Sequence, residues 1–136
     1  MRDNKALEHI RVLVVEDEKD TRDLLGFVLQ SHGAIPVLCS NVTEALGQLK
    51  EQTPHVIVAD IAMPDYNGYA FIAAIRKEDQ GEISKTPVIA LTAYSSSADR
   101  DTALNSGFNE YMVKPFEPGI LVTTIKRLYN EHHVAA

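Results

Sequence analysis

Five polar side chains that could transfer a phosphoryl group follow short apolar runs in the sequence. Glu16 and Asp17 follow the first run, Asp60 the third, Thr92 the fourth and Lys114 the fifth. Carboxylates that lie close together raise one another's pKa, so they stay ionised only beside a cation. Mg²⁺ fits because it takes one or two carboxylates together with water and phosphate oxygens. With a carboxylate nucleophile and donors from lysine and threonine, the set predicts phosphoryl transfer to a carboxylate.

Each of these residues also has an ordinary interpretation. An acidic run such as Glu16-Asp17-Glu18 is typical of a helix start, where it interacts favourably with the helix dipole. A lone Asp after a strand often forms a turn. Only the combination at several strand ends favours a site. The five histidines have no metal-ligand spacing, and we interpret them as surface or packing residues.

The apolar runs predict a sheet that would bring these residues together. They alternate with helical patterns along the chain. Five strand–helix pairs in strict alternation predict an α/β fold, a doubly wound parallel sheet with helices on both faces. Right-handed crossovers favour the (βα)5 flavodoxin-like strand order 2-1-3-4-5. The predicted strands are Ile10–Val15, Ala34–Leu38, His55–Ala59, Pro87–Leu91 and Glu110–Val113.

The helices are predicted from their apolar stripes and end signals. Gly33 and Gly107 are placed to end two of them. Asn41 with Glu44 indicates a helix start, and Pro36 indicates that its strand lies at the sheet edge. The apolar stripes of four helices are Leu24, Leu25, Val28 and Leu29; Val42, Ala45, Leu46 and Leu49; Phe71, Ile72 and Ile75; and Ile120, Leu121, Ile125 and Leu128. A further helix is predicted over Ser95–Ser106.

Parallel strands end at the same edge of a sheet, so the polar residues should share one crevice. Ligands of open α/β sheets bind outside the carboxyl ends of the strands, where the strand order reverses. That crevice would hold three carboxylates, one hydroxyl and one ammonium.

Length and composition limit the classes of protein that fit. The 136 residues correspond to one domain, which we place at 10–130, between a polar lead (1–9) and a C-terminal tail (131–136). The net charge of −6 argues against a nucleic-acid-binding protein. Cys39 is the one cysteine, which excludes an intrachain disulfide. No secretory signal or apolar run of ~18 residues is present, so we expect a cytoplasmic location without membrane contact.

Four stretches of sequence carry a resemblance to a known family. From about Ile10 to Leu128, the chain resembles the receiver domain of two-component response regulators. The matching stretches are Val14-Val15-Glu16-Asp17-Glu18; Val58-Ala59-Asp60 with Met63-Pro64 and Gly68; Ala90-Leu91-Thr92-Ala93; and Val113-Lys114-Pro115-Phe116.

The resemblance implies a role for each residue of the crevice. Asp60 would be the phosphoacceptor. Mg²⁺ would be held by Asp17 directly, by Glu16 largely through water, and by the carbonyl of Ala62. The side chains of Thr92 and Lys114 and the amide of Ala93 would bind the phosphoryl oxygens. The chain would be a phospho-accepting switch that assists its own phosphorylation and dephosphorylation, and not a conventional enzyme.

The resemblance also implies how the signal leaves the site. Tyr111 would be the switch aromatic that turns inward as Thr92 moves toward the phosphoryl group, although a half-buried strand tyrosine is an adequate alternative. The Lys114–Pro115 bond would be cis. Ala62 and Tyr94 depart from the common family pattern, which leaves the lifetime of the phosphorylated form open. Tyr66 departs as well, without an assigned role.

The implied partners are proteins. The donor would be a histidine kinase or a histidine phosphotransfer domain, and the reader a downstream protein or a domain in cis. We expect a single-domain protein or an isolated receiver, with the C-terminal receiver of a hybrid histidine kinase slightly favoured. The output face would be the fourth helix, fifth strand and fifth helix. A homodimer stays open, since charged residues there either pair across a two-fold axis or are solvated; these are Arg100, Asp101, Lys126 and Arg127.

Two other functions fit the same fold. A flavodoxin-like cofactor binder needs a phosphate-cradling loop after the first strand, where this chain has Glu16-Asp17-Glu18-Lys19-Asp20. A phosphatase with an aspartyl nucleophile usually has a second Asp two residues later, where this chain has Ala62. Flavin absorbance, or rapid turnover of a phosphate ester, would favour these alternatives.

Overall fold

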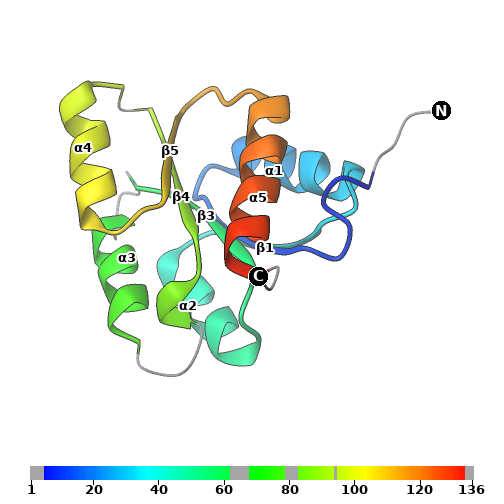
Figure 1. The fold of residues 1–136 in the computed structure, drawn as a ribbon, viewed down its shortest axis with the longest axis horizontal. Helices are drawn as coiled ribbons and strands as arrows, with labels where there is room; N and C mark the ends of the chain where they lie inside the picture. Colours follow the sequence, from blue (N-terminus) through cyan, green and yellow to red (C-terminus); the bar gives the residue numbers. More distant parts are fainter. Residues whose placement is uncertain (1–4, 62–67, 79–82, 94, 134–136) are drawn as a thin grey trace.

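The fold alternates strands and helices around one sheet (Figure 1). The computed structural model describes residues 5–61, 68–78, 83–93 and 95–133. The strands are β1 (Arg11–Val15), β2 (Ile35–Cys39), β3 (Val56–Asp60), β4 (Val88–Thr92) and β5 (Glu110–Val113). The helices are α1 (Lys19–Ser31), α2 (Val42–Glu51), α3 (Gly68–Lys77), α4 (Ser97–Ser106) and α5 (Pro118–His133), with the 3-10 turn η1 (Ile83–Lys85) before β4.

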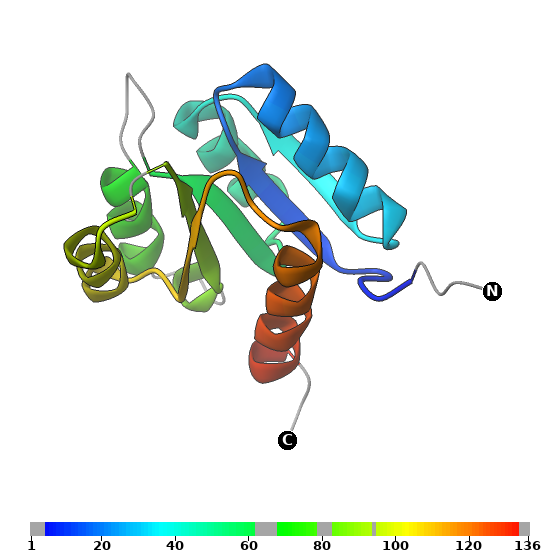
Figure 2. The same ribbon diagram turned by 90° about the horizontal axis from the view of Figure 1, so that it is seen from above.

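The five strands are all parallel and lie in the order β2-β1-β3-β4-β5. This confirms the predicted doubly wound α/β fold. Viewed from above, α1 and α5 cover one face of the sheet, and α2, α3 and α4 cover the other (Figure 2). The strand order reverses between β1 and β3, which is where ligands bind in this class of fold.

Two apolar cores, one on each face, hold the layers together. In β1, Leu13 and Val15 belong to the core under α2, α3 and α4, whereas Val12 and Val14 belong to the core under α1 and α5. Strands covered on both faces need apolar side chains at consecutive positions. This explains why the sequence shows continuous apolar runs instead of alternation.

Local signals in the sequence act as predicted, with one shift. β2 is an edge strand, as Pro36 indicated. Asn41 caps α2, because its Oδ1 accepts a hydrogen bond from the Glu44 amide at 2.8 Å. The Glu44 carboxylate reaches back one residue further than in a capping box and accepts from the Ser40 amide at 2.7 Å.

Both ends of the chain contribute more to the fold than the sequence indicated. Leu7, within the segment predicted as a polar lead, is fully buried, and its amide donates to the His32 carbonyl at 2.8 Å. Helix α5 continues to His133, into the predicted tail.

Leu24 and Ile120 lie outside the buried stripes of their helices, with exposed fractions of 48% and 59%. Among the described helices, none has the length and apolar character needed to cross a membrane.

Candidate phosphoryl-transfer site

The polar residues predicted to converge do lie at the carboxyl edge of the sheet. Glu16 and Asp17 follow β1, Asp60 and Thr92 are the last residues of β3 and β4, and Lys114 follows β5. The strands position them because parallel strands end at a common edge. The site therefore draws one or two residues from each of four strand ends.

Three carboxylates form a cluster at this edge. Glu16, Asp17 and Asp60 each offer an oxygen, and these oxygens all lie within 4.8 Å of one another. Glu16 and Asp60 are buried, while Asp17 is exposed. Hard oxygen ligands with one open side suit Mg²⁺, which keeps several waters when it binds protein carboxylates. The residues present therefore fit the ion that the sequence implied.

Lys114 pairs with two of the three carboxylates. Its Nζ lies 2.9 Å from Glu16 Oε1 and donates to Asp60 Oδ2 at 3.1 Å. Burial alone would lower the pKa of Lys114, but its hydrogen bonds to Glu16 and Asp60 outweigh burial and leave the pKa above its ordinary value. Burial raises the pKa of Glu16, although the hydrogen bond from Lys114 opposes it. An ammonium is thus fixed beside the predicted nucleophile.

The loop after β1 is held by a residue that the sequence did not single out. Arg22 Nη1 donates to the carbonyls of Glu16 at 2.9 Å and Asp17 at 3.3 Å. The Glu18 amide donates to Glu16 Oε2 at 3.0 Å. These bonds fix the main chain that carries the two carboxylates. The available signal was a basic residue one turn into the helix that follows an acidic loop.

The ends of β4 and β5 are joined next to Asp60. The Lys114 amide donates to the Thr92 carbonyl at 2.7 Å, and the Lys114–Pro115 bond is cis, as predicted. Thr92 is fully buried, whereas Ala93 is exposed. The strand order places β4 directly beside β3, so Thr92 lies next to the cluster.

Tyr111 lies two residues further from the edge than Val113, opposite Ala90 of β4. Its ring is half-buried against the core under α2, α3 and α4. Burial raises the pKa of its phenol, and the Asp99 carboxylate at the start of α4 raises it further. This position suits both the switch role and the alternative of a half-buried strand tyrosine. The remaining positions discussed from the sequence lie outside the described residues: Ala62, Met63, Pro64, Tyr66 and Tyr94.

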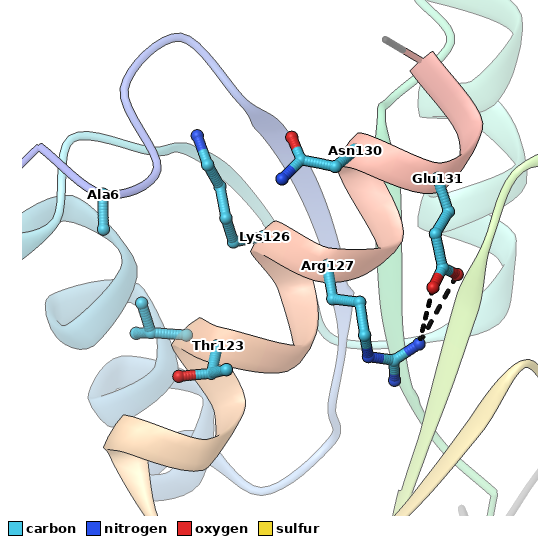
Figure 3. A pocket seen from close by; sticks show the side chains of 7 residues that line it. Ala6, Thr123, Lys126, Arg127, Asn130 and Glu131 are labelled. Atoms are coloured by element: carbon cyan, nitrogen blue, oxygen red, sulfur yellow. Dashed lines mark hydrogen bonds and ion pairs between the residues drawn. The ribbon is translucent and has the colours of Figure 1, made fainter. Parts of the chain in front are cut away.

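A hollow lies along α5, away from the strand ends. It has a volume of about 520 Å³ and is lined by Val122 and the six residues labelled in Figure 3. Both of its cations already have partners: the Arg127 guanidinium pairs with Glu131 at 3.3 Å and with Glu110 of β5, and the Lys126 ammonium lies 5.9 Å from the centre of the Tyr129 ring. The carboxyl edge remains the better candidate for chemistry.

Comparisons with known proteins identify the family of this chain. The response regulator receiver domain family matches residues 12–126. An uncharacterized 14.6 kDa protein in the sodA1 3′ region of Leptolyngbya boryana is 42% identical over 90% of this chain and 92% of its own length. The phosphate regulon transcriptional regulatory protein PhoB of Escherichia coli is 38% identical over 85% of this chain, which spans about half of PhoB (50%).

A solved structure shows the same fold with a metal ion. The receiver domain of the sensor histidine kinase PA1611 from Pseudomonas aeruginosa has a magnesium ion coordinated in its active site cleft. It superposes with a TM-score of 0.80 at 29% identity, over 90% of this chain and 98% of that one. Fold, strand-end cluster and family match agree, and the chain therefore belongs to the response regulator receiver domain family, whose members are phospho-accepting switch domains of two-component signalling.

Proposed function

We propose that Asp60 accepts a phosphoryl group from the phosphohistidine of a histidine kinase or phosphotransfer domain. The observation that carries this proposal is the environment of the Asp60 carboxylate. It lies in a cluster of carboxylates within 4.8 Å of one another and accepts a hydrogen bond from Lys114 at 3.1 Å. A nucleophile beside a cation site and a fixed ammonium is what phosphoryl transfer requires.

In the proposed step, an Asp60 oxygen bonds to phosphorus as the bond to the donor imidazole nitrogen breaks, and that nitrogen keeps the electron pair. Mg²⁺ would be held by Glu16, Asp17, Asp60 and the carbonyl of Ala62. When bound, the ion neutralises charge on the phosphoryl oxygens. Lys114 would shift its ammonium from the two carboxylates toward a phosphoryl oxygen. The Thr92 hydroxyl and the Ala93 amide would donate to the others. Hydrolysis by water would later return Asp60 to its free form.

The signal would leave through α4, β5 and α5. Thr92 would move toward the phosphoryl group, and Tyr111 would turn inward behind it, which shifts a balance between two conformations. The Asp99 carboxylate near the Tyr111 phenol connects this ring to the first turn of α4. The reader would be a protein, either a separate partner or a domain of the same chain, in the cytoplasm.

Labelling with a small phosphodonor tests the proposal. Acetyl phosphate with Mg²⁺ should phosphorylate the protein, and Asp60→Asn should abolish the label because it removes the nucleophile. Asp17→Ala should weaken Mg²⁺ binding, measured by titration. Asp23→Asn is a matched control, since Asp23 pairs with Lys19 on the exposed side of α1. Equal labelling of the wild type and Asp60→Asn would exclude Asp60 as the acceptor.

The output could also involve a homodimer through the same face. Arg127 is committed to Glu110 and Glu131 within its own chain, which leaves Arg100, Asp101 and Lys126 for contacts across a two-fold axis. Sedimentation with and without beryllofluoride, a phosphoryl mimic, measures this directly. A dimer only with beryllofluoride supports dimerisation as the output. A monomer in both states leaves a partner domain as the reader.

A further inference from the structure

Helix α4 has little apolar packing to hold it on the sheet. Of its ten residues, Ala103 is the buried one. Its N-terminal end is capped by Ser96, whose Oγ accepts from the Asp99 amide at 3.0 Å. Its C-terminal end is capped by Gly107, with a left-handed φ of 119°. The position of this helix therefore depends strongly on what holds its two ends.

The C-terminal end is held by Arg76 of α3. Its Nε and Nη2 both donate to the Gly107 carbonyl, at 3.1 and 2.7 Å. Its Nη1 donates to the carbonyls of Ser84 at 3.0 Å and Thr86 at 2.7 Å, in the connection before β4. Its Nη2 also donates to Asn109 Oδ1 at 2.8 Å. All five N–H donors of the guanidinium are thus used.

These partners are neutral oxygens, so Arg76 does not act here as an anion site. Burial lowers the pKa of Arg76 from the ordinary arginine value. A guanidinium stays protonated in proteins, so Arg76 is a cation. The half-buried cation is satisfied by hydrogen bonds that only a planar fork can make together. A lysine at this position could not reproduce them.

The close approach explains why residue 107 is a glycine. A Cβ there would lie 3.3 Å from Arg76 Cγ and 3.3 Å from Ile72 Cγ1, in a left-handed backbone conformation that side chains rarely adopt. The absence of a side chain lets the α4 cap lie directly on α3.

The same network fixes the start of β5. Asn109 Oδ1 accepts from the Val88 amide at 2.8 Å, and the Asn109 amide donates to the Val88 carbonyl at 2.8 Å. Arg76 therefore connects α3, the start of β4, the end of α4 and the start of β5. Because α4 runs back from the carboxyl edge, this network lies at the end of α4 remote from Asp60.

We propose that Arg76 is a positioning residue that anchors the C-terminal end of α4, so that the helix pivots about Gly107 when the site is phosphorylated. The regulatory part of this inference rests on the proposed phosphorylation of Asp60. The first turn of α4, near Thr92 and Tyr111, moves, while the last turn stays on α3. A pivot converts a small change at the site into a directed change of the α4 surface.

Amide hydrogen exchange tests both the anchor and the pivot. In the resting wild type, Ser106 and Gly107 should exchange more slowly than Arg100 and Asp101. Beryllofluoride with Mg²⁺ should change the amide exchange rates of Arg100 and Asp101 and leave the exchange rate of Gly107 unchanged. Arg76→Lys keeps the charge but loses the fork, so exchange at Ser106 and Gly107 should become about tenfold faster, because bonds to a charged group are lost.

A control variant and a labelling measurement distinguish failure of the anchor, of the pivot and of the proposed function. Lys77→Met, which removes an exposed charge from the next residue of α3, should leave exchange in α4 unchanged. Arg76→Lys should keep its Asp60 labelling, since Arg76 does not contact the site. Unchanged exchange at Gly107 in Arg76→Lys overturns the anchor. A beryllofluoride response as large at Gly107 as at Arg100 overturns the pivot. If the wild type takes no label, the proposed function fails, while exchange in the resting state still decides the anchor.

Discussion

Helices α4 and α5 flank the edge strand β5 from opposite faces of the sheet, but they are held in different ways (Figure 2). Helix α5 buries Leu121, Val122, Ile125 and Leu128, and α4 buries Ala103. Apolar side-chain burial stabilises each large residue by about 1.5–3 kcal/mol. Helix α5 is therefore held along its length, and α4 is held chiefly at its C-terminal end, where Arg76 contacts Gly107.

The difference separates two tasks within one face. A helix held by interdigitated side chains moves only at the cost of many packed contacts. A helix anchored chiefly at one end can shift at the other while few contacts are lost, which is typical of elements that move in regulation. We infer that α4 carries the conformational response and that α5 provides the fixed reference beside it.

Truncation of a buried side chain in each helix should give the largest difference between α4 and α5, measured as the loss in the free energy of unfolding. Ile125→Ala in α5 should lower the free energy of unfolding by about 3 kcal/mol, because it leaves a cavity in a close-packed core. Ala103→Gly in α4 should lower it by about 1 kcal/mol, mainly through helix propensity. Urea denaturation of both variants measures the two values. Equal losses would contradict the difference in packing.

Thr92→Ala should separate phosphoryl acceptance from the response of α4. Thr92 is buried at the end of β4, and under the proposed function its hydroxyl would contact the phosphoryl group without attacking it. Labelling of Asp60 should persist, while coupling to α4 weakens by about tenfold. Amide chemical shifts with and without beryllofluoride measure this coupling. Shifts at Tyr111 and beyond Ser95 that match the wild type would exclude Thr92 as the coupling residue.

Much of this architecture could be predicted from the sequence because it depends on local patterns. The apolar runs located all five strands, and the polar residues that follow them located Glu16, Asp17, Asp60 and Lys114 at one edge. A parallel sheet converts position along each strand into position in space, so a local pattern was sufficient.

Arg76 was missed because its partners are distant in the sequence. Arg76 bonds to Gly107 and Asn109, which lie 31 and 33 residues away, and no spacing rule connects them. Its one signal was its place four residues after Ile72, on the apolar side of α3. Leu7 was missed because a single apolar residue in a polar segment carries no periodicity.

The C-terminal end of α5 is attached by contacts whose contribution to stability should be small and should depend on pH. His133 Nε2 donates to the His55 carbonyl at 2.7 Å, and the rings of His55, Tyr129 and His133 pack together with centroids 5.1–5.4 Å apart. His55 Nδ1 accepts from the Arg11 amide at 2.9 Å, which requires this nitrogen to be unprotonated. The Lys126 ammonium lies 5.9 Å from the centre of the Tyr129 ring. The hydrogen bond from the Arg11 amide thus holds the His55 imidazole in its neutral form.

Acid should therefore loosen α5 at this end. Burial lowers the pKa of His55 below its ordinary 6.5, and the charges of Arg11 and His133 lower it further. The folded state then binds fewer protons than the unfolded state, so this stability is present above pH 6.5 and is lost as the pH falls through 6.5 toward the lower folded pKa. Thermal unfolding followed across this range should show the decline in the wild type, and His55→Gln should reduce it because the titrating group is gone. His132→Gln is the matched control, since His132 is exposed and bonds within its own helix to the Leu128 carbonyl. A decline that persists unchanged in His55→Gln would assign the effect to other groups and remove His55 from the attachment of α5.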